Sequence, residues 1–173
     1  MDLNNKKVLV AFFSHSGKNY VNGNVVDLTI GNTKVVAKYI SEITKADTFE
    51  IESINAYPND YNECTSVARK ELNADFRPKL KSDIVIDDYD VIFLGYPNWW
   101  GTMPMPVWTF IESYDFTKKI ILPFCTHEGS QMGSSENDLR MLLPDIVIKR
   151  GLAIRGSEAN NSKAKVQKWI ERA

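Results

Sequence analysis

Short apolar runs alternate with amphipathic stretches along this chain. Three continuous apolar runs occupy residues 8–13, 91–94 and 120–124. Strands that are covered by helices on both faces show this pattern, so we predict that these three are central strands of a mostly parallel sheet. Residues 48–52 alternate between polar and apolar, which indicates a strand near an edge with one wetter face. The fifth predicted strand, residues 145–154, contains a Lys-Arg-Gly interruption that suggests a bulge or bend.

Amphipathic helices are predicted to connect the strands. Asn32 or Thr33 is expected to cap the first helix, and the Ser135 and Asp138 pair fits a capping box at the start of a later one. In each helix the apolar residues recur three or four positions apart, so that one face points at the sheet. These residues are Val36, Ile40 and Ile43, then Val107, Phe110 and Ile111, then Leu139, Leu142 and Leu143, and finally Val166, Trp169 and Ile170.

The stretch between the second and third predicted strands is longer than a simple crossover. Residues 55–80 hold a predicted helix at 63–73, which we interpret as an elaboration within one domain. At 173 residues the chain is long enough to bury one sizeable core. The alternation of strands and helices therefore predicts an α/β fold of three layers, with a single domain over residues 1–173.

Charge and composition narrow the classes of partner. The 21 basic and 22 acidic side chains give a formal net charge of -1, so the chain has no basic field that would gather nucleic acid or anionic lipid. The apolar run near the start is too short to span a bilayer, and we expect a cytoplasmic protein with no membrane partner. Cys64 and Cys125 are interpreted as reduced packing thiols, and the aspartates within residues 83–90 as a solvated turn and not a metal site.

Candidate chemistry is sought at the carboxyl ends of the strands. Ligands of open parallel sheets bind there, near the point where the strand order reverses. Three loops follow the three apolar strands at that edge. They contain Ser14, His15, Ser16 and Gly17; Pro97, Asn98, Trp99, Trp100 and Gly101; and Thr126, His127, Glu128, Gly129 and Ser130.

The first loop offers hydroxyls and backbone N–H groups to an anion. It leads, after a detour, into Asn32, Thr33 and the first helix, whose N-terminal dipole would favour a phosphate by roughly 0.3–2 kcal/mol. Neither a P-loop nor a GxGxxG dinucleotide turn is present. Ser14, Ser16 and Thr33 are explained equally well as ordinary turn and cap residues, so the loop alone does not decide between the two interpretations.

The second loop places two adjacent tryptophans directly after a buried strand. Taken alone, Trp99 and Trp100 would be one core residue and one residue that faces a partner. Beside a phosphate loop on the neighbouring strand, a stacked aromatic cofactor explains them better. The third loop carries backbone donors that suit the carbonyl edge of such a ring. A hydrolase that uses a loop serine with His15 or His127 has little support, because the chain lacks a GxSxG elbow.

In these loops the sequence resembles the flavodoxin family. Ser-His-Ser-Gly at 14–17, followed by Asn32 and Thr33, resembles the phosphate signature hydroxyl-x-hydroxyl-Gly-x-Thr, split by an insertion. Gly-Tyr-Pro-Asn-Trp-Trp-Gly at 95–101 resembles the loop that flanks the isoalloxazine ring, in the double-Trp form of a bacterial branch. Residues 125–129 match the third flavin loop loosely. The resemblance covers nearly the whole chain and implies a doubly wound, five-stranded parallel sheet in the order 2-1-3-4-5, with FMN as cofactor.

The resemblance also implies roles for the loop residues. Hydroxyls of Ser14, Ser16 and Thr33 would bind the phosphate, with backbone contacts from Gly17 and Asn32. The second loop would line one side of the ring, and the third would meet its pyrimidine edge. The full set of expected cofactor-binding residues is Ser14, His15, Ser16, Gly17, Lys18, Asn32, Thr33, Pro97, Asn98, Trp99, Trp100, Gly101, Thr126, His127, Glu128 and Gly129.

Two departures from the family pattern bear on function. Residues 18–31 form an insertion that is able to fold over the site, where Lys18, Asn19 or Tyr20 would contact the phosphate or ribityl chain. The third loop has no aromatic residue, whereas many flavodoxins stack a tyrosine there. The outer face of the flavin is therefore expected to be open.

The resemblance implies a redox role, for which two forms are open. In the first, which we favour, the protein is an electron carrier between redox partner proteins. In the second, it is an FMN-dependent NAD(P)H reductase that acts on a quinone or another small acceptor. The net charge of -1 favours the reductase, because carriers of this family are usually strongly acidic. No segment resembles a nicotinamide-nucleotide site, which favours the carrier. A monomer and a homodimer both fit the sequence.

Overall fold

A computed structural model describes residues 3–173 of the chain. The strands of its main sheet are β1 (Val8–Phe12), β4 (Asp47–Glu50), β5 (Val91–Pro97), β6 (Ile120–His127), β7 (Val147–Ile148) and β8 (Leu152–Arg155). All of their pairings are parallel, in the order β4-β1-β5-β6, with β7 and β8 both beside β6. The predicted order 2-1-3-4-5 is thus confirmed, and the predicted interruption separates the fifth strand into two pieces.

The middle of the sheet explains why its strands are continuous apolar runs. All five residues of β1 are buried, and Val10 pairs with Thr48 on one side and Phe93 on the other. Helices cover both faces of this strand, so polar side chains have no exposed position on it. At the carboxyl end of β5, a Cβ on Gly95 would lie 2.1 Å from the Phe124 ring, so only glycine permits this approach of β5 and β6.

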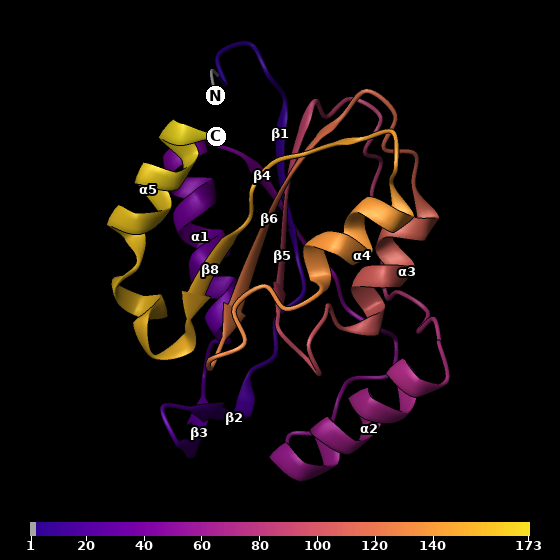
Figure 1. The fold of residues 1–173 in the computed structure, drawn as a ribbon, viewed down its shortest axis with the longest axis vertical. Helices are drawn as coiled ribbons and strands as arrows, with labels where there is room; N and C mark the ends of the chain where they lie inside the picture. Colours follow the sequence, from indigo (N-terminus) through magenta and orange to yellow (C-terminus); the bar gives the residue numbers. More distant parts are fainter. Residues whose placement is uncertain (1–2) are drawn as a thin grey trace.

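Helices lie on both faces of the sheet (Figure 1). One face is covered by α1 (Asn32–Thr44) and α5 (Lys163–Arg172), which pack together with the 3₁₀ helix η1 (Gly156–Asn161). The other face is covered by α3 (Met105–Ser113) and α4 (Ser135–Leu142). Each face buries its own apolar cluster, as expected for a three-layer α/β arrangement.

The helix caps differ from those predicted. Gly31 is the N-cap of α1, and the Ser14 hydroxyl from the first loop accepts the hydrogen bond of the Lys34 backbone N–H at 3.1 Å. The N-cap of α4 is Ser134, one residue before the predicted position. Ser135 is fully buried instead, where its hydroxyl accepts a hydrogen bond from the Tyr96 hydroxyl at 2.9 Å. Both predicted caps were wrong, because residues distant in the chain intervene. Ser14 supplies the hydroxyl at the start of α1, and Tyr96 binds the Ser135 hydroxyl that was expected to cap α4.

The insertion forms an antiparallel hairpin of β2 (Gly17–Val21) and β3 (Asn24–Leu28) at the carboxyl edge of the main sheet (Figure 1). Its two turn residues, Asn22 and Gly23, have φ values of 49° and 90°. Asn-Gly is the favoured pair for such a turn, because both central residues need a positive φ. Local sequence therefore determines this hairpin, although the pattern was not interpreted as one.

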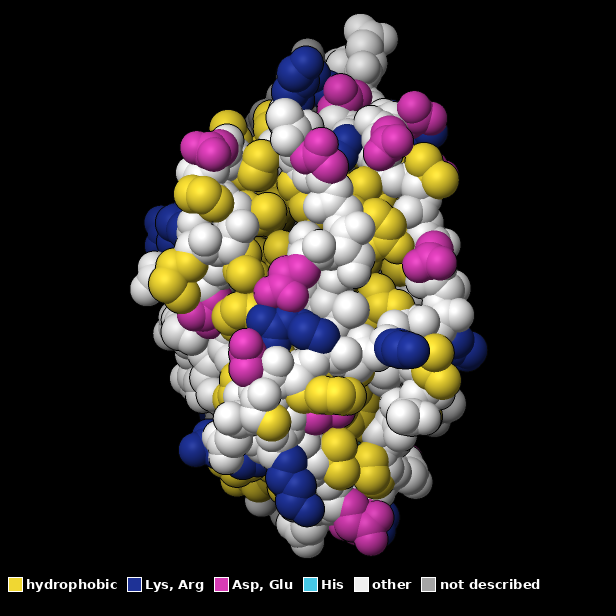
Figure 2. Space-filling model, turned by 90° about the vertical axis from the view of Figure 1, so that its right-hand side faces the viewer, with side chains coloured by type: hydrophobic (Ala, Val, Ile, Leu, Met, Phe, Trp, Pro, Cys, Tyr) yellow, Lys and Arg dark blue, Asp and Glu magenta, His cyan; other side chains and the backbone are white. Residues whose placement is uncertain are grey.

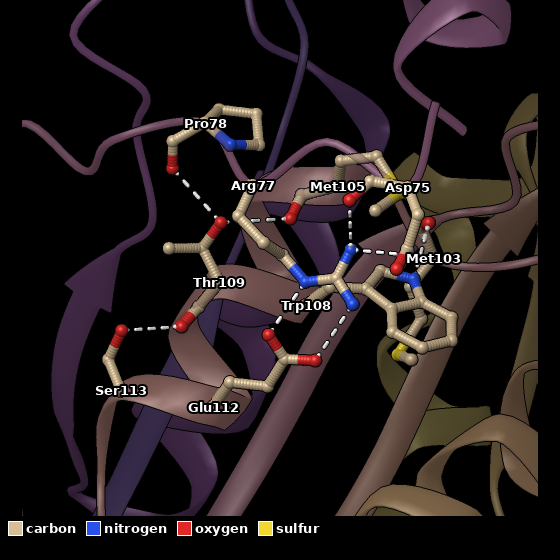
Figure 3. Close-up of polar contacts among 9 residues, drawn as sticks. All are labelled: Asp75, Arg77, Pro78, Met103, Met105, Trp108, Thr109, Glu112 and Ser113. Atoms are coloured by element: carbon tan, nitrogen blue, oxygen red, sulfur yellow. Dashed lines mark hydrogen bonds and ion pairs between the residues drawn. The ribbon is translucent and has the colours of Figure 1, made fainter. Parts of the chain in front are cut away.

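The long crossover forms α2 (Tyr61–Asn73), two residues longer at its start than predicted. Asp60 caps it by accepting hydrogen bonds from the backbone N–H groups of Asn62 and Glu63 at 3.0 and 3.2 Å. The segment after α2 is tied to α3 in Figure 3, where Arg77 binds Glu112 through two nitrogens at 2.6 and 2.8 Å. The same guanidinium binds the Asp75 carboxylate at 2.6 Å and lies over the Trp108 ring.

The thiols and aspartates behave as packing and surface groups. Cys64 and Cys125 are free and buried, and burial raises the pKa of the Cys64 thiol to about 12. Asp88 forms an ion pair with the Lys7 ammonium at 3.3 Å, and Asp90 accepts a hydrogen bond from the Lys7 backbone N–H. None of the helices within residues 3–173 has the length and apolar character needed to cross a bilayer.

Candidate functional site

A cavity of about 490 Å³ opens at the carboxyl edge of the sheet. Its volume lies within the range of ligand pockets in proteins, roughly 300–1,000 Å³. All three predicted loops contribute to its wall, together with the hairpin and α2. The predicted residues that line it are His15, Asn32, Thr33, Pro97, Asn98, Trp99, Trp100, Thr126, His127 and Glu128.

Part of the first loop turns away from this cavity, as do Gly101 and Gly129 at the ends of the other two loops. The Ser14 hydroxyl caps α1, and Ser16 is exposed. Gly17 begins the hairpin with a φ of 80°, and a Cβ there would lie 1.6 Å from the Asn59 side chain. Lys18 forms an ion pair with Asp60 at 3.6 Å. The hairpin therefore brings Gly17 and Lys18 toward the start of α2.

One end of the cavity lies at the start of α1. The hydroxyls of Thr33 and Thr126 are buried there, 2.7 Å apart. The first backbone N–H groups of a helix have no intrahelical partner, so they and the helix dipole make this end suitable for an anion. A Cβ on Gly156 would lie 2.4 Å from Glu128 Oε1 and 2.5 Å from Asn32 Nδ2, so glycine is needed at this end.

Trp99 lies in an aromatic cluster at the cavity wall. Its ring makes edge contacts with Phe13, Tyr57 and His15, at centroid distances of 5.2, 5.0 and 5.7 Å. Such edge-to-face pairs stabilise a fixed ring orientation. Trp99 thereby joins the second loop to the first, which is where a ligand that contacts both loops would lie.

Trp100 occupies an exposed turn position with 49% of its surface accessible. It has a φ of 54° and Gly101 a φ of 86°, in a two-residue turn that hydrogen bonds between Trp99 and Thr102 close. A positive φ is costly for a bulky residue. Two contacts with α2 hold Trp100 there: its indole N–H donates to the Thr65 carbonyl at 3.0 Å, and Arg69 lies 4.7 Å from its ring.

Two polar atoms in the cavity wall are buried without a hydrogen-bond partner among residues 3–173: His15 Nε2 and Glu128 Oε1. Buried polar groups normally have partners, so an unpaired atom at a cavity wall indicates a ligand or water as partner. Burial lowers the pKa of His15 below its usual 6.5, and burial also lowers that of His127. Both imidazoles are therefore neutral near pH 7.

The sequence did not single out several residues of the wall. Tyr61, Cys64, Thr65 and Ala68 come from α2, and Gly156 begins η1 directly after β8. The helix itself was predicted, but nothing in its sequence indicates that it packs beside the tryptophan loop. Asn19 and Tyr20 also line the cavity. Both belong to the insertion that was expected to be able to fold over the site.

Solved structures similar to this one include flavoproteins. Residues 7–173 match the flavodoxin family. A candidate flavoprotein from Bacteroides eggerthii DSM 20697 is 29% identical, with a TM-score of 0.78 over 96% of this chain and 97% of that one. A flavoprotein from Lactobacillus acidophilus NCFM, solved in complex with FMN, is 21% identical, with a TM-score of 0.69 over 95% and 99% of the two chains. No curated protein matches. Because the family match spans nearly the whole sequence, this chain belongs to the flavodoxin family.

Proposed function

We propose that this protein binds one FMN non-covalently in the cavity and carries electrons between redox partners. The observation that carries the proposal is the composition of the cavity wall. The wall combines an aromatic loop, a hydroxyl pair at a helix N-terminus and a polar third loop. Among residues 3–173, no Lys or Arg lines the cavity.

The residues present fit FMN. Thr33 and the N-terminus of α1 would hold the phosphate, and Trp99 or Trp100 would lie against the ring. The unpaired His15 Nε2 and Glu128 Oε1 need a partner that the described chain does not supply. FMN supplies the redox chemistry when bound, and the protein provides binding, orientation and electrostatics.

The charge of the wall favours a carrier over a reductase. NADH and NADPH carry at least two phosphates, and productive binding requires donors that hold the nicotinamide ring against the flavin. Among the described residues, the wall contains the carboxylate of Glu128 and neither Lys nor Arg. With no cationic side chain in the described wall to hold these phosphates, the site offers no second place for a nucleotide.

One observation favours the second candidate, an FMN-dependent NAD(P)H reductase with a small acceptor. The rings of Tyr20 and Tyr61 lie 6.2 Å apart at the cavity wall, one from the hairpin and one from α2. These rings, with Thr65 and Ala68, extend the wall beyond the loops that the flavodoxin pattern predicts. A small planar quinone would pack well against such a surface.

The surface supports local recognition of a partner. Figure 2 shows the face over α2, α3 and α4, where hydrophobic side chains and charges of both signs are intermixed. Among the described residues, no continuous field of one sign covers this face. A redox partner would therefore be recognised by local contacts, with little long-range electrostatic steering.

Two measurements test the proposal. The absorbance spectrum of the purified protein should show a bound flavin, and anaerobic mixing with NADPH should reduce it only slowly and without saturation. A reductase protein added to the mixture should reduce it readily. Rapid, saturable bleaching by NADPH alone would reject the carrier and favour the reductase. A protein that does not bind added FMN would reject both.

A further inference from the structure

The two carboxylate oxygens of Glu128 have different surroundings. Oε2 accepts a hydrogen bond from the Asn22 backbone N–H at the hairpin tip at 2.9 Å, and it lies 3.7 Å from Arg155 Nε. Oε1 is buried and has no partner among residues 3–173, although Glu128 lines the cavity. The protein therefore uses one oxygen for its own structure, and the other has no partner among the described residues.

The position of Oε1 is fixed before a ligand arrives. The hairpin tip and Arg155 hold Oε2, and only 16% of the Glu128 side chain is exposed. On the other side, Oε1 lies against Gly156, so close that a Cβ on this glycine would clash with it. Asn32 Nδ2 lies almost equally close to the same glycine. Oε1 thus lies beside Gly156, near the start of α1, in a position that the protein's own contacts hold.

The chemistry of a carboxylate restricts its partner. An ionised carboxylate oxygen only accepts hydrogen bonds, so the ligand must bring an O–H or N–H group to this point. A phosphate dianion has no donor, so it cannot supply this hydrogen bond. The flavin ring belongs beside the tryptophan loop, if the proposed function is correct. The remaining donors of FMN are the hydroxyls of its ribityl chain, which links the ring to the phosphate.

We infer that Glu128 determines ligand specificity by accepting a hydrogen bond at Oε1 from a ribityl hydroxyl. The inference rests on the proposed binding of FMN. It assigns Glu128 a role different from the contact with the pyrimidine edge that the family resemblance implies for the third loop. The site selects flavins that carry a hydroxylated side chain. A flavin without one would leave the buried Glu128 Oε1 without a hydrogen-bond donor.

The test compares three flavins: FMN, riboflavin and lumiflavin, which has the ring but no ribityl chain. Each is titrated into apo protein and followed by its fluorescence. Glu128→Ala should raise the Kd of FMN and of riboflavin by about ten-fold or more, as expected for the loss of a hydrogen bond to a charged group. The Kd of lumiflavin should change by less than about two-fold, since it makes no such bond.

Two further variants complete the design. Glu128→Gln keeps the size of the side chain and should show the same selectivity with a smaller loss, so it carries the test if Glu128→Ala does not fold. Glu158→Gln removes an equal charge from an exposed residue of η1 and should change no affinity. Equal losses for lumiflavin and riboflavin, or unchanged binding of FMN and riboflavin, would overturn the inference. Failure of the parent protein to bind FMN would instead reject the proposed function.

Discussion

The hydroxyls of Thr33 and Thr126 lie 2.7 Å apart and join the first turn of α1 to the end of β6. The two residues are 93 positions apart in the chain, and both are buried. A sequence pattern identifies each as a loop hydroxyl, but only the fold pairs them. The pair lies at the helix N-terminus, where a phosphate would be bound.

The first prediction concerns this pair. Thr33→Val removes the hydroxyl and keeps the shape of the side chain. FMN affinity should fall by about ten-fold, because a charge-assisted hydrogen bond to the phosphate is lost. Riboflavin lacks the phosphate, so its affinity should change little. Fluorescence titration with both flavins measures the difference, and equal losses for the two would contradict the prediction.

Ser16→Ala is the companion variant, because the sequence pattern places Ser16 at the phosphate and the structure leaves it exposed and away from the cavity wall. If the loop keeps this conformation, Ser16→Ala should leave FMN affinity within about two-fold of the parent. A loss as large as that of Thr33→Val would mean that the first loop rearranges when FMN binds.

The second prediction distinguishes the two tryptophans. Trp99 bridges the first and second loops, whereas Trp100 is held outward by Thr65 and Arg69. A tryptophan in contact with the flavin ring quenches flavin emission. Trp99→Leu should therefore brighten bound FMN, and Trp100→Leu should leave it dark. The opposite ranking of the two variants would place Trp100 against the ring.

The third prediction is a pH dependence of stability in the apo protein. Burial lowers the pKa of His15 below 6.5, so the unfolded chain binds a proton at a pH where the folded chain does not. The free energy of unfolding should therefore fall as the pH falls through about 6.5. Urea unfolding at about pH 5.5 and 7.5 should show a smaller pH effect in His15→Gln than in the parent.

His127 shifts stability in the same direction, because burial also lowers its pKa. His127→Gln should reduce the pH effect independently, and the two reductions should add, because the rings have different neighbours: His15 lies against Trp99, and His127 accepts a hydrogen bond from the Gly129 backbone N–H. An unchanged pH effect in His15→Gln would show that His15 is protonated equally readily in the folded and unfolded chains.

The fourth prediction concerns the attachment of the crossover to α3. Arg77→Ala should lower the free energy of unfolding by about 1 kcal/mol, since the pair with Glu112 is bidentate but partly exposed. Arg77→Lys should recover little of this loss, because an ammonium cannot match the two carboxylate oxygens at once. Denaturation curves of the three proteins in low and high salt would measure the effect. A full recovery by lysine would contradict the geometric argument.

Most of the sheet was predictable because its signals are local. Strands that are buried on both faces must be continuous apolar runs, and β1, β5 and β6 lie where those runs were found. The interruption of the last strand was also visible in the sequence. The cap of α1 was predicted wrongly because Ser14, distant in the chain, accepts the Lys34 N–H hydrogen bond there. The cap of α4 was predicted wrongly because a serine near a helix start is a good cap only if no distant group binds its hydroxyl. Tyr96 claims Ser135 in this way.

The sequence by itself determined the order of strands and helices, the three loops at the carboxyl edge, and the family to which they point. These depend on the alternation of residues and on short motifs, which are properties of neighbours in the chain. The tertiary structure decided which loop atoms face the cavity. Ser14 and Lys18 make structural contacts, with the Lys34 backbone N–H and with Asp60. Thr65 of α2 lines the cavity. One carboxylate oxygen of Glu128 is bound by the protein, and the other has no partner among the described residues. Such contacts join residues far apart in sequence, so no local pattern encodes them.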